Sequence, residues 1–155
     1  MSQIALTFPD GSVRHYDKGV TVDQVAASIG SSLAKATLAG KFQGQLVDHD
    51  RPLESDGTIE IITDKSPEAL EIMRHSTAHL MAHALTRLYP GIHFGVGPAI
   101  ESGFYYDTDK EVQLTEDDLP AVEKEMKKII SQNYPIVRRE VSRAEALELF
   151  KHDPY

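Results

Sequence analysis

Apolar and polar residues alternate with a period of two over several short stretches of residues 1–64, and one stretch between them has helical spacing instead. Such alternation predicts strands that bury one face, whereas the helical spacing predicts a short amphipathic helix. We expect the strands at residues 4–8, 13–16, 36–39 with 41–42, 45–47 and 58–62, and the helix at residues 22–29. A hairpin, a helix, two short strands and a last strand, in that order, are typical of a small β-grasp, ubiquitin-like fold.

Local signals mark the ends of these elements. Residues 9–12 read Pro-Asp-Gly-Ser, a turn in which proline presets φ, aspartate offers a local acceptor and glycine relaxes the backbone. Thr21 or Asp23 can cap the helix. His15 and His49 are single histidines beside turns, and we expect both to be surface residues.

Residues 65–155 contain a longer stretch with helical spacing. Ser66 can cap a helix that has Pro67 at its first position and extends to about Leu88. Seven of its residues should share one side and pack on the domain core. They are Leu70, Met73, Thr77, Leu80, Met81, Ala84 and Leu88.

Three histidines recur at intervals of four residues in this helix: His75, His79 and His83. Residues spaced in this way stack along one side of a helix, and here that side is roughly opposite the apolar stripe. The placement weighs against core histidines. It leaves two interpretations, a solvated face or one wall of a cleft.

Further elements follow the histidine helix. Residues 92–97 and 103–107 are expected to form paired strands, in which Tyr105 and Tyr106 point to opposite faces. Two capping boxes then predict a helix from Thr115 and a helix at residues 143–150. Residues 136–141, between the two helices, are expected to form a strand. The first box is Thr115 with Asp118, and the second is Ser142 with Glu145. The apolar side of the first helix consists of Leu119, Val122, Met126, Ile129 and Ile130.

The composition is that of an ordinary globular chain. Its 155 residues suffice for one domain or two small ones, and the net charge of −8 is divided equally between residues 1–64 and 65–155. A broad basic surface for nucleic acid is therefore not expected, although net charge does not decide what a pocket can hold. No apolar run reaches the length of a membrane span, the first residues lack a signal-peptide pattern, and the absence of Cys fits a cytosolic chain.

The histidine row suits three uses. A His-x-x-x-His pair can bind zinc, but Ser76 stands where the zinc-protease helix has Glu, and a third ligand would have to be Asp, Glu or His83. General acid–base or water-positioning work in hydrolysis is the second use, because a neutral imidazole is well matched to it. The third possibility is that the row has no chemical role. The residues by themselves leave these alternatives open.

Residues 75–84 and 97–107, in that order, resemble the amino-terminal region of bacterial threonyl-tRNA synthetases. Residues 8–12 with 15–17 are similar to the first domain of that family, a β-grasp domain called TGS. The two blocks together are specific, whereas the histidine spacing alone also occurs in alanyl-tRNA synthetases and free-standing editing proteins. The resemblance covers essentially the whole chain.

The resemblance implies an α+β architecture of two domains. Residues 1–64 would be a TGS-like β-grasp domain. Residues 65–155 would be the first part of a tRNA-editing domain, truncated, with the histidine-bearing helix packed on an antiparallel sheet.

In the family, the second domain hydrolyses serine mistakenly attached to threonine tRNA, so the resemblance implies a cytoplasmic threonine–tRNA ligase that binds the 3′ end of tRNA(Thr). His75 and His79 match the editing histidines, which position water or handle protons. Tyr106 matches a tyrosine that lines the pocket, and His83 continues the row as a supporting, substrate-binding residue.

The family completes the editing pocket with a lysine and a Cys-x-x-x-His segment further along, which this chain does not contain. ATP with magnesium, a zinc ion and the homodimer contacts likewise belong to family domains outside it, so we expect no cofactor or metal here and little activity from the chain by itself. Two alternatives stay open. One is an RNA- or ligand-binding regulatory module without catalysis, and the other is a free-standing trans-editing deacylase.

Overall fold

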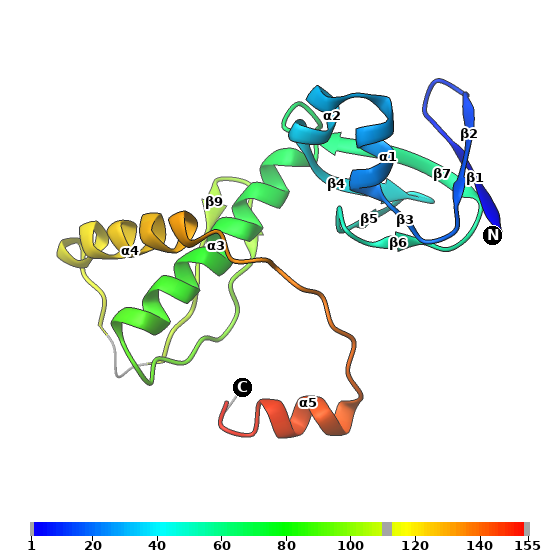
Figure 1. Cartoon of the computed structure of the whole chain (residues 1–155). Helices are drawn as coiled ribbons and strands as arrows, with labels where there is room; N and C mark the ends of the chain where they lie inside the picture. The colour runs from blue at the N-terminus through cyan, green and yellow to red at the C-terminus, as the bar shows by residue number, and fades with distance from the viewer. Residues whose placement is uncertain (1, 110–112, 154–155) are drawn as a thin grey trace. The chain divides into compact units, whose positions relative to one another are not determined.

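The structure, a computed structural model, describes residues 2–109 and 113–153. The chain forms two compact units, residues 1–72 and residues 73–155 (Figure 1). Helix α3, Ala69–Leu88, begins in the first unit and continues through the second. Within the described ranges, no helix is both long and apolar enough to cross a membrane.

A mixed five-stranded sheet forms the first unit, in the order β2-β1-β7-β4-β5. β1 lies parallel to β7, and the other neighbouring strands are antiparallel. A separate two-stranded ladder pairs β3 with β6. The bounds are β1 Gln3–Thr7, β2 Val13–Asp17, β3 Val20–Thr21, β4 Thr37–Phe42, β5 Gln45–Val47, β6 Pro52–Leu53 and β7 Gly57–Thr63.

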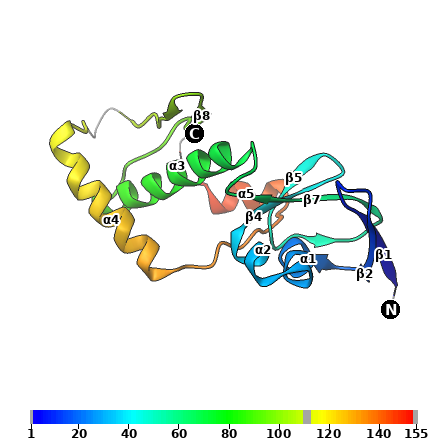
Figure 2. The ribbon, with the colours of Figure 1, turned by 90° about the horizontal axis from the view of Figure 1, so that it is seen from above.

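Helix α1, Val22–Ile29, packs its apolar side on this sheet, and Figures 1 and 2 show α1 and α2 on the same face. Thr21, one of the two expected cap residues, caps α1, and it does so in a reciprocal capping box with Gln24. The core contains no polar side chain among its fully buried members, which are Ile4, Leu6, Val22, Val25, Leu53 and Ile59. This arrangement confirms the predicted β-grasp fold.

Helix α2 and strand β4 differ from the prediction, and the β3–β6 ladder was not expected. Helix α2, Ser31–Ala36, was not expected, because six residues are too few to show a helical period. Residues 36–39 and 41–42 do not form separate stretches: β4 is continuous through Gly40. α1 packs so closely there that a Cβ on Gly40 would lie 2.6 Å from Cγ2 of Val22.

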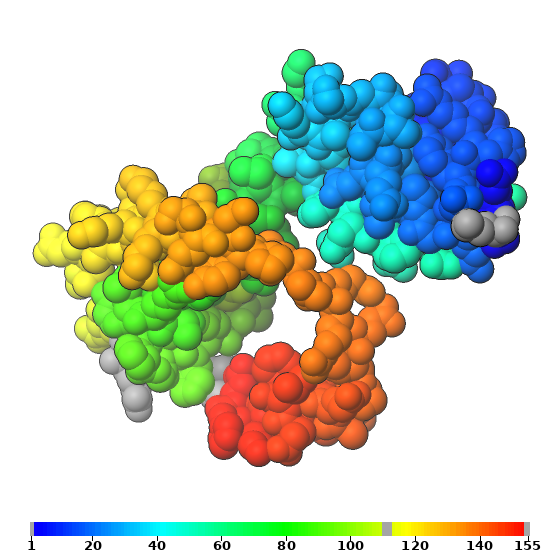
Figure 3. Space-filling view, in the orientation of Figure 1, coloured from blue at the N-terminus to red at the C-terminus, as the bar shows by residue number. Residues whose placement is uncertain are grey.

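The second unit is built on α3 and α4, Leu119–Gln132, which lie side by side (Figures 1 and 3). Between them is a core of buried side chains with a half-buried rim that includes Phe94 and Met126. The buried members are Ala84, Leu85, Ile92, Val122 and Ile129. Strands β8, Ala99–Ile100, and β9, Gly103–Phe104, form a short antiparallel hairpin, and a bridge between Phe94 and Thr108 extends the pairing.

The histidine helix begins later than predicted. The Oγ of Ser66 accepts a hydrogen bond from the Thr63 N–H at 3.0 Å, so this side chain turns back toward β7 and the helix starts at Ala69. The predicted core stripe is correct in its second half and wrong in its first. Leu70 and Met73 are 58% and 52% exposed, because the core with α4 begins further along α3, where Ala78 is buried.

The predicted strands are the least accurate part of the second unit. Regular pairing within residues 92–107 is limited to β8 and β9, so the expected ladder is shorter than predicted. No strand forms at residues 136–141, and Ile136 and Val137 are 93% and 77% exposed. A strand needs a neighbour for its backbone hydrogen bonds, and none is present among the described residues.

The helices around that stretch are as predicted. α4 follows a 3₁₀ turn, Glu116–Asp118, with the Thr115–Asp118 capping box in place. α5, Arg143–Leu149, has the Ser142–Glu145 box. Of the five residues expected on the apolar side of α4, Leu119 and Ile130 are instead exposed.

Candidate functional site

His75 and His79 lie one helical turn apart on α3 and contact each other directly. Their Nε2 atoms are 2.9 Å apart, and the two rings meet edge to face with centroids 4.5 Å apart. Both side chains are exposed. A hydrogen bond between two ring nitrogens requires one to carry a proton and the other to be bare, so the two imidazoles share one proton at this contact.

His83 continues the row by one further turn, and its side chain is also exposed. It makes no hydrogen bond to any residue in the ranges that the structure describes. The structure therefore pairs two members of the predicted row and leaves the third beside them. All three face solvent on α3, away from the core formed with α4.

Tyr106 follows β9 and is half-buried, whereas its neighbour Tyr105 is exposed, as expected for successive residues of an extended segment. The Tyr106 ring meets Phe94 edge to face at 5.2 Å. It also lies directly over Gly97, where a Cβ would come within 2.5 Å of the ring. No hydrogen bond or ring contact joins Tyr106 to His75 or His79 among the described residues.

Arg74, which sequence analysis did not single out, connects the histidine helix to the hairpin before Tyr106. Its Nη1 donates a hydrogen bond to the backbone oxygen of Ile100 at 3.1 Å. Ile100 is the last residue of β8, and Arg74 immediately precedes His75. Local spacing carries no signal for this contact, because its partners are separated by 26 residues.

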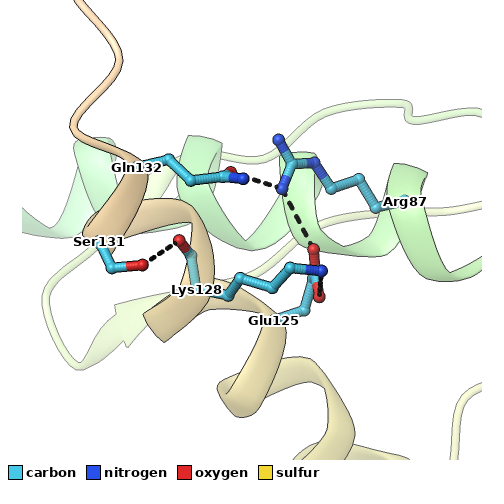
Figure 4. Close-up of polar contacts among 5 residues, drawn as sticks. All are labelled: Arg87, Glu125, Lys128, Ser131 and Gln132. Carbon is cyan, nitrogen blue, oxygen red and sulfur yellow. Dashed lines mark hydrogen bonds and ion pairs between the residues drawn. The ribbon is translucent and has the colours of Figure 1, made fainter.

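Polar contacts hold α4 beside α3 (Figure 4). Nη1 of Arg87, on α3, donates to Oε1 of Glu125 at 3.2 Å and to Oε1 of Gln132 at 2.9 Å, both on α4. The bond with Glu125 raises the pKa of Arg87 and lowers the pKa of that carboxyl. Lys128 lies 3.4 Å from the other oxygen of Glu125. These contacts hold α3, the helix that bears the histidine pair, against α4.

Two further histidines have carboxylate partners that sequence spacing did not reveal. His93 Nδ1 lies 2.7 Å from Oδ2 of Asp109, and this hydrogen bond lowers the pKa of the Asp109 carboxyl. His49 Nδ1 lies 2.6 Å from Oδ2 of Asp23. His49 and His15 are both exposed, in agreement with the expectation that they are surface residues.

A metal site needs several ligating side chains at one point. Within residues 2–109 and 113–153, no three His, Asp or Glu side chains are grouped so that they could hold an ion.

Comparison with known proteins agrees with this architecture. Residues 4–63 match the family model of the TGS domain, so the first unit contains a TGS domain of the β-grasp type. The chain is 62% identical over 153 residues to the threonine–tRNA ligase of Enterococcus faecalis, a match that covers 98% of the chain and 24% of the relative. It is 56% identical over 155 residues to that of Staphylococcus carnosus, which covers 100% of the chain and 24% of the relative.

The chain thus spans about a quarter of the length of the curated relatives it matches. The resemblance to bacterial threonyl-tRNA synthetases, which the motifs at residues 75–84 and 97–107 indicate, is confirmed over essentially the whole chain.

Proposed function

We propose that this chain is the amino-terminal part of a threonine–tRNA ligase, and that His75 and His79 belong to a site that hydrolyses serine wrongly attached to tRNA(Thr). The observation that carries the proposal is the exposed imidazole pair, with 2.9 Å between its Nε2 atoms. The similarity to threonine–tRNA ligases supports the parent activity.

The physical need for such a site follows from the two amino acids. Serine lacks only the methyl group of threonine, and a missing methyl group offers about 1–3 kcal/mol of discrimination, or roughly 10–200-fold. Protein synthesis needs greater accuracy than that. A second site that hydrolyses the smaller product supplies the difference.

The histidine pair has the groups that ester hydrolysis requires. The oxygen of a water molecule adds to the ester carbonyl carbon, the bond from that carbon to the ribose oxygen breaks, and serine and free tRNA result. One proton leaves the water and one reaches the ribose oxygen. With one proton shared between the Nε2 atoms, a neutral pair presents one bare outer nitrogen and one outer N–H. It can therefore accept the first proton at one end and donate the second at the other.

Tyr106 and His83 would complete this wall of the site as contacts to the 3′ end of tRNA(Thr). The lysine and the Cys-x-x-x-His segment of the opposite wall, the ATP, magnesium and zinc sites and the dimer contacts would come from the rest of a cytoplasmic ligase. The chain by itself is then inactive or nearly so in deacylation.

The test uses the full-length ligase and tRNA(Thr) charged with serine. His75→Ala and His79→Ala are each expected to lower the deacylation rate about 100-fold or more, since each removes a proton-transfer group, while the attachment of threonine continues. His15→Ala is the matched control in the first unit and should leave deacylation unchanged. Deacylation at the wild-type rate by both His75→Ala and His79→Ala would contradict the proposal. Full-rate deacylation by residues 1–155 alone would show that no opposite wall is needed.

A further inference from the structure

We propose that Arg74 is a positioning residue that holds the β8–β9 hairpin, and with it the segment that bears Tyr106, against the helix that carries His75 and His79. The inference rests on the proposed editing function. In this proposal, one hydrogen bond between α3 and the hairpin positions the tyrosine-bearing side of the site.

The first step is the contact itself. The Arg74 guanidinium donates to the Ile100 backbone oxygen at 3.1 Å, and Ile100 pairs with Gly103 in the hairpin ladder. Tyr106 lies three residues after Gly103. Arg74 is half-buried although its neighbour His75 is exposed, so its side chain is directed to the hairpin rather than into solvent.

The second step is the other end of the hairpin, which is tied to the same helix through packing. Phe94 belongs to the core cluster that includes Leu80 and Met81 of α3. Tyr106 packs against Phe94 at 5.2 Å and over the bare backbone of Gly97. The Gly95 N–H donates to the Asp107 oxygen and the Asp107 N–H donates to the Val96 oxygen, so the two ends of this segment are joined at its base. The segment that bears Tyr106 is therefore attached to α3 at its base by Phe94 and near its tip by Arg74.

The third step concerns charge. Among the residues that the structure describes, Arg74 has no carboxylate partner, so its described polar contact is with the Ile100 carbonyl. Loss of the guanidinium releases the tip of the hairpin and leaves the Phe94 packing intact. The segment that bears Tyr106 then keeps its Phe94 contact but is no longer held at the hairpin, and a displacement of about 1 Å is enough to cost as much as 100-fold in rate.

The experiment is a double-mutant cycle in the full-length ligase, with deacylation of serine-charged tRNA(Thr) as the readout. Arg74→Met keeps the aliphatic stem and removes the donors, Arg74→Lys restores one donor, and Tyr106→Phe keeps the ring and removes the hydroxyl. Arg74→Met and Tyr106→Phe are each expected to lower kcat/KM by about tenfold or more. Arg74→Lys should recover most of the loss, and the Arg74→Met/Tyr106→Phe variant should lose little more than the worse single variant. Attachment of threonine, which needs none of these groups, should be unchanged in all of them.

Three results would overturn the proposal. Deacylation by Arg74→Met at the wild-type rate would show that the hydrogen bond is not needed. If the rate of the Arg74→Met/Tyr106→Phe variant fell by the product of the two single-variant factors, Arg74 and Tyr106 would act independently. A weaker salt dependence of binding in Arg74→Met would show instead that the guanidinium contacts a tRNA phosphate. If the proposed editing function itself is wrong, His75→Ala leaves deacylation unchanged. That result is independent of the Arg74 variants, so the two failures can be told apart.

Discussion

Gly40 shows how a single position determines packing in the TGS domain. A Cβ at this point would lie 2.6 Å and 3.0 Å from the two γ-carbons of Val22 and 3.3 Å from Cγ2 of Val47. Val22 is fully buried and its branched side chain is stiff, so it cannot move aside cheaply. Gly40→Ala is therefore expected to lower the free energy of unfolding of the first unit by about 1–3 kcal/mol, the usual cost of overpacking.

Thermal unfolding followed by circular dichroism measures this effect. Gly30→Ala is the matched control, because a Cβ at Gly30 would meet nothing within 4 Å and its φ of 176° is extended backbone that alanine adopts readily. Equal unfolding temperatures for the two variants would show that α1 can shift away from β4 without cost.

At the same scale, the sequence predicts which residues share a helix side but not which distant residues meet. The four-residue spacing of His75 and His79 places them together, as the 2.9 Å contact confirms. The contacts from Arg74 to Ile100 and from His93 to Asp109 depend on how the chain returns to α3. No local pattern contains that information.

Among the elements, the start of α4 depends on one carboxylate. Asp118 accepts hydrogen bonds from the Thr115 N–H at 2.8 Å, the Thr115 hydroxyl at 2.9 Å and the Tyr89 hydroxyl at 3.0 Å. These bonds, the Thr115 N–H first, hold the pKa of Asp118 below its usual value. A carboxyl whose pKa is lower in the folded chain stabilises it above the unfolded pKa of about 3.9, and the effect is lost as pH falls through the folded pKa.

Asp118→Asn should therefore lower the unfolding temperature of the second unit at pH 7. The difference from the wild type should shrink as the pH falls below about 4, where the wild-type carboxyl is protonated as well. Asp117→Asn is the control on the adjacent residue. A difference that stays constant from pH 7 to pH 2 would mean that the charge of Asp118 makes no contribution.

Elements with strong local signals are predicted well, and elements that need a distant partner are not. The capping boxes at Thr115 and Ser142 form as predicted, and Thr21 caps α1 as one of the two expected candidates, since each of these contacts lies within four residues. Residues 136–141 have the composition of a strand but no neighbour among the described residues, and no strand forms there. β-propensity describes a fit to a sheet, which the segment cannot supply for itself.

For the whole molecule, the two units differ in how much of their apolar surface is buried. The first buries an uninterrupted core under one sheet, and its fold follows from the order of its elements. The second has a core between α3 and α4, while Leu147, Leu149 and Phe150 of its last helix region are exposed. The spacing of its histidine row could be predicted from the sequence, whereas the contact of Arg74 with Ile100 required the structure.

The boundary between the units gives the last prediction. Sequence patterns place the end of the first domain at residue 64, but Nζ of Lys41 on β4 lies 2.5 Å from Oε1 of Glu68, and Ala69 is buried. The bond with Lys41 lowers the pKa of Glu68, so the pair stabilises the unit at neutral pH.

Isolated residues 1–72 should therefore unfold cooperatively at a temperature close to that of the same unit in the whole chain. Residues 1–64 should unfold about 5 °C lower, the scale on which losses of single contacts are measured in domains of this size. Glu68→Gln in residues 1–72 separates the ion pair from the extra length and should account for part of the difference, a part that disappears in acid. Equal unfolding temperatures for the two lengths would place the boundary at residue 64, with the Lys41–Glu68 pair and the burial of Ala69 contributing nothing measurable.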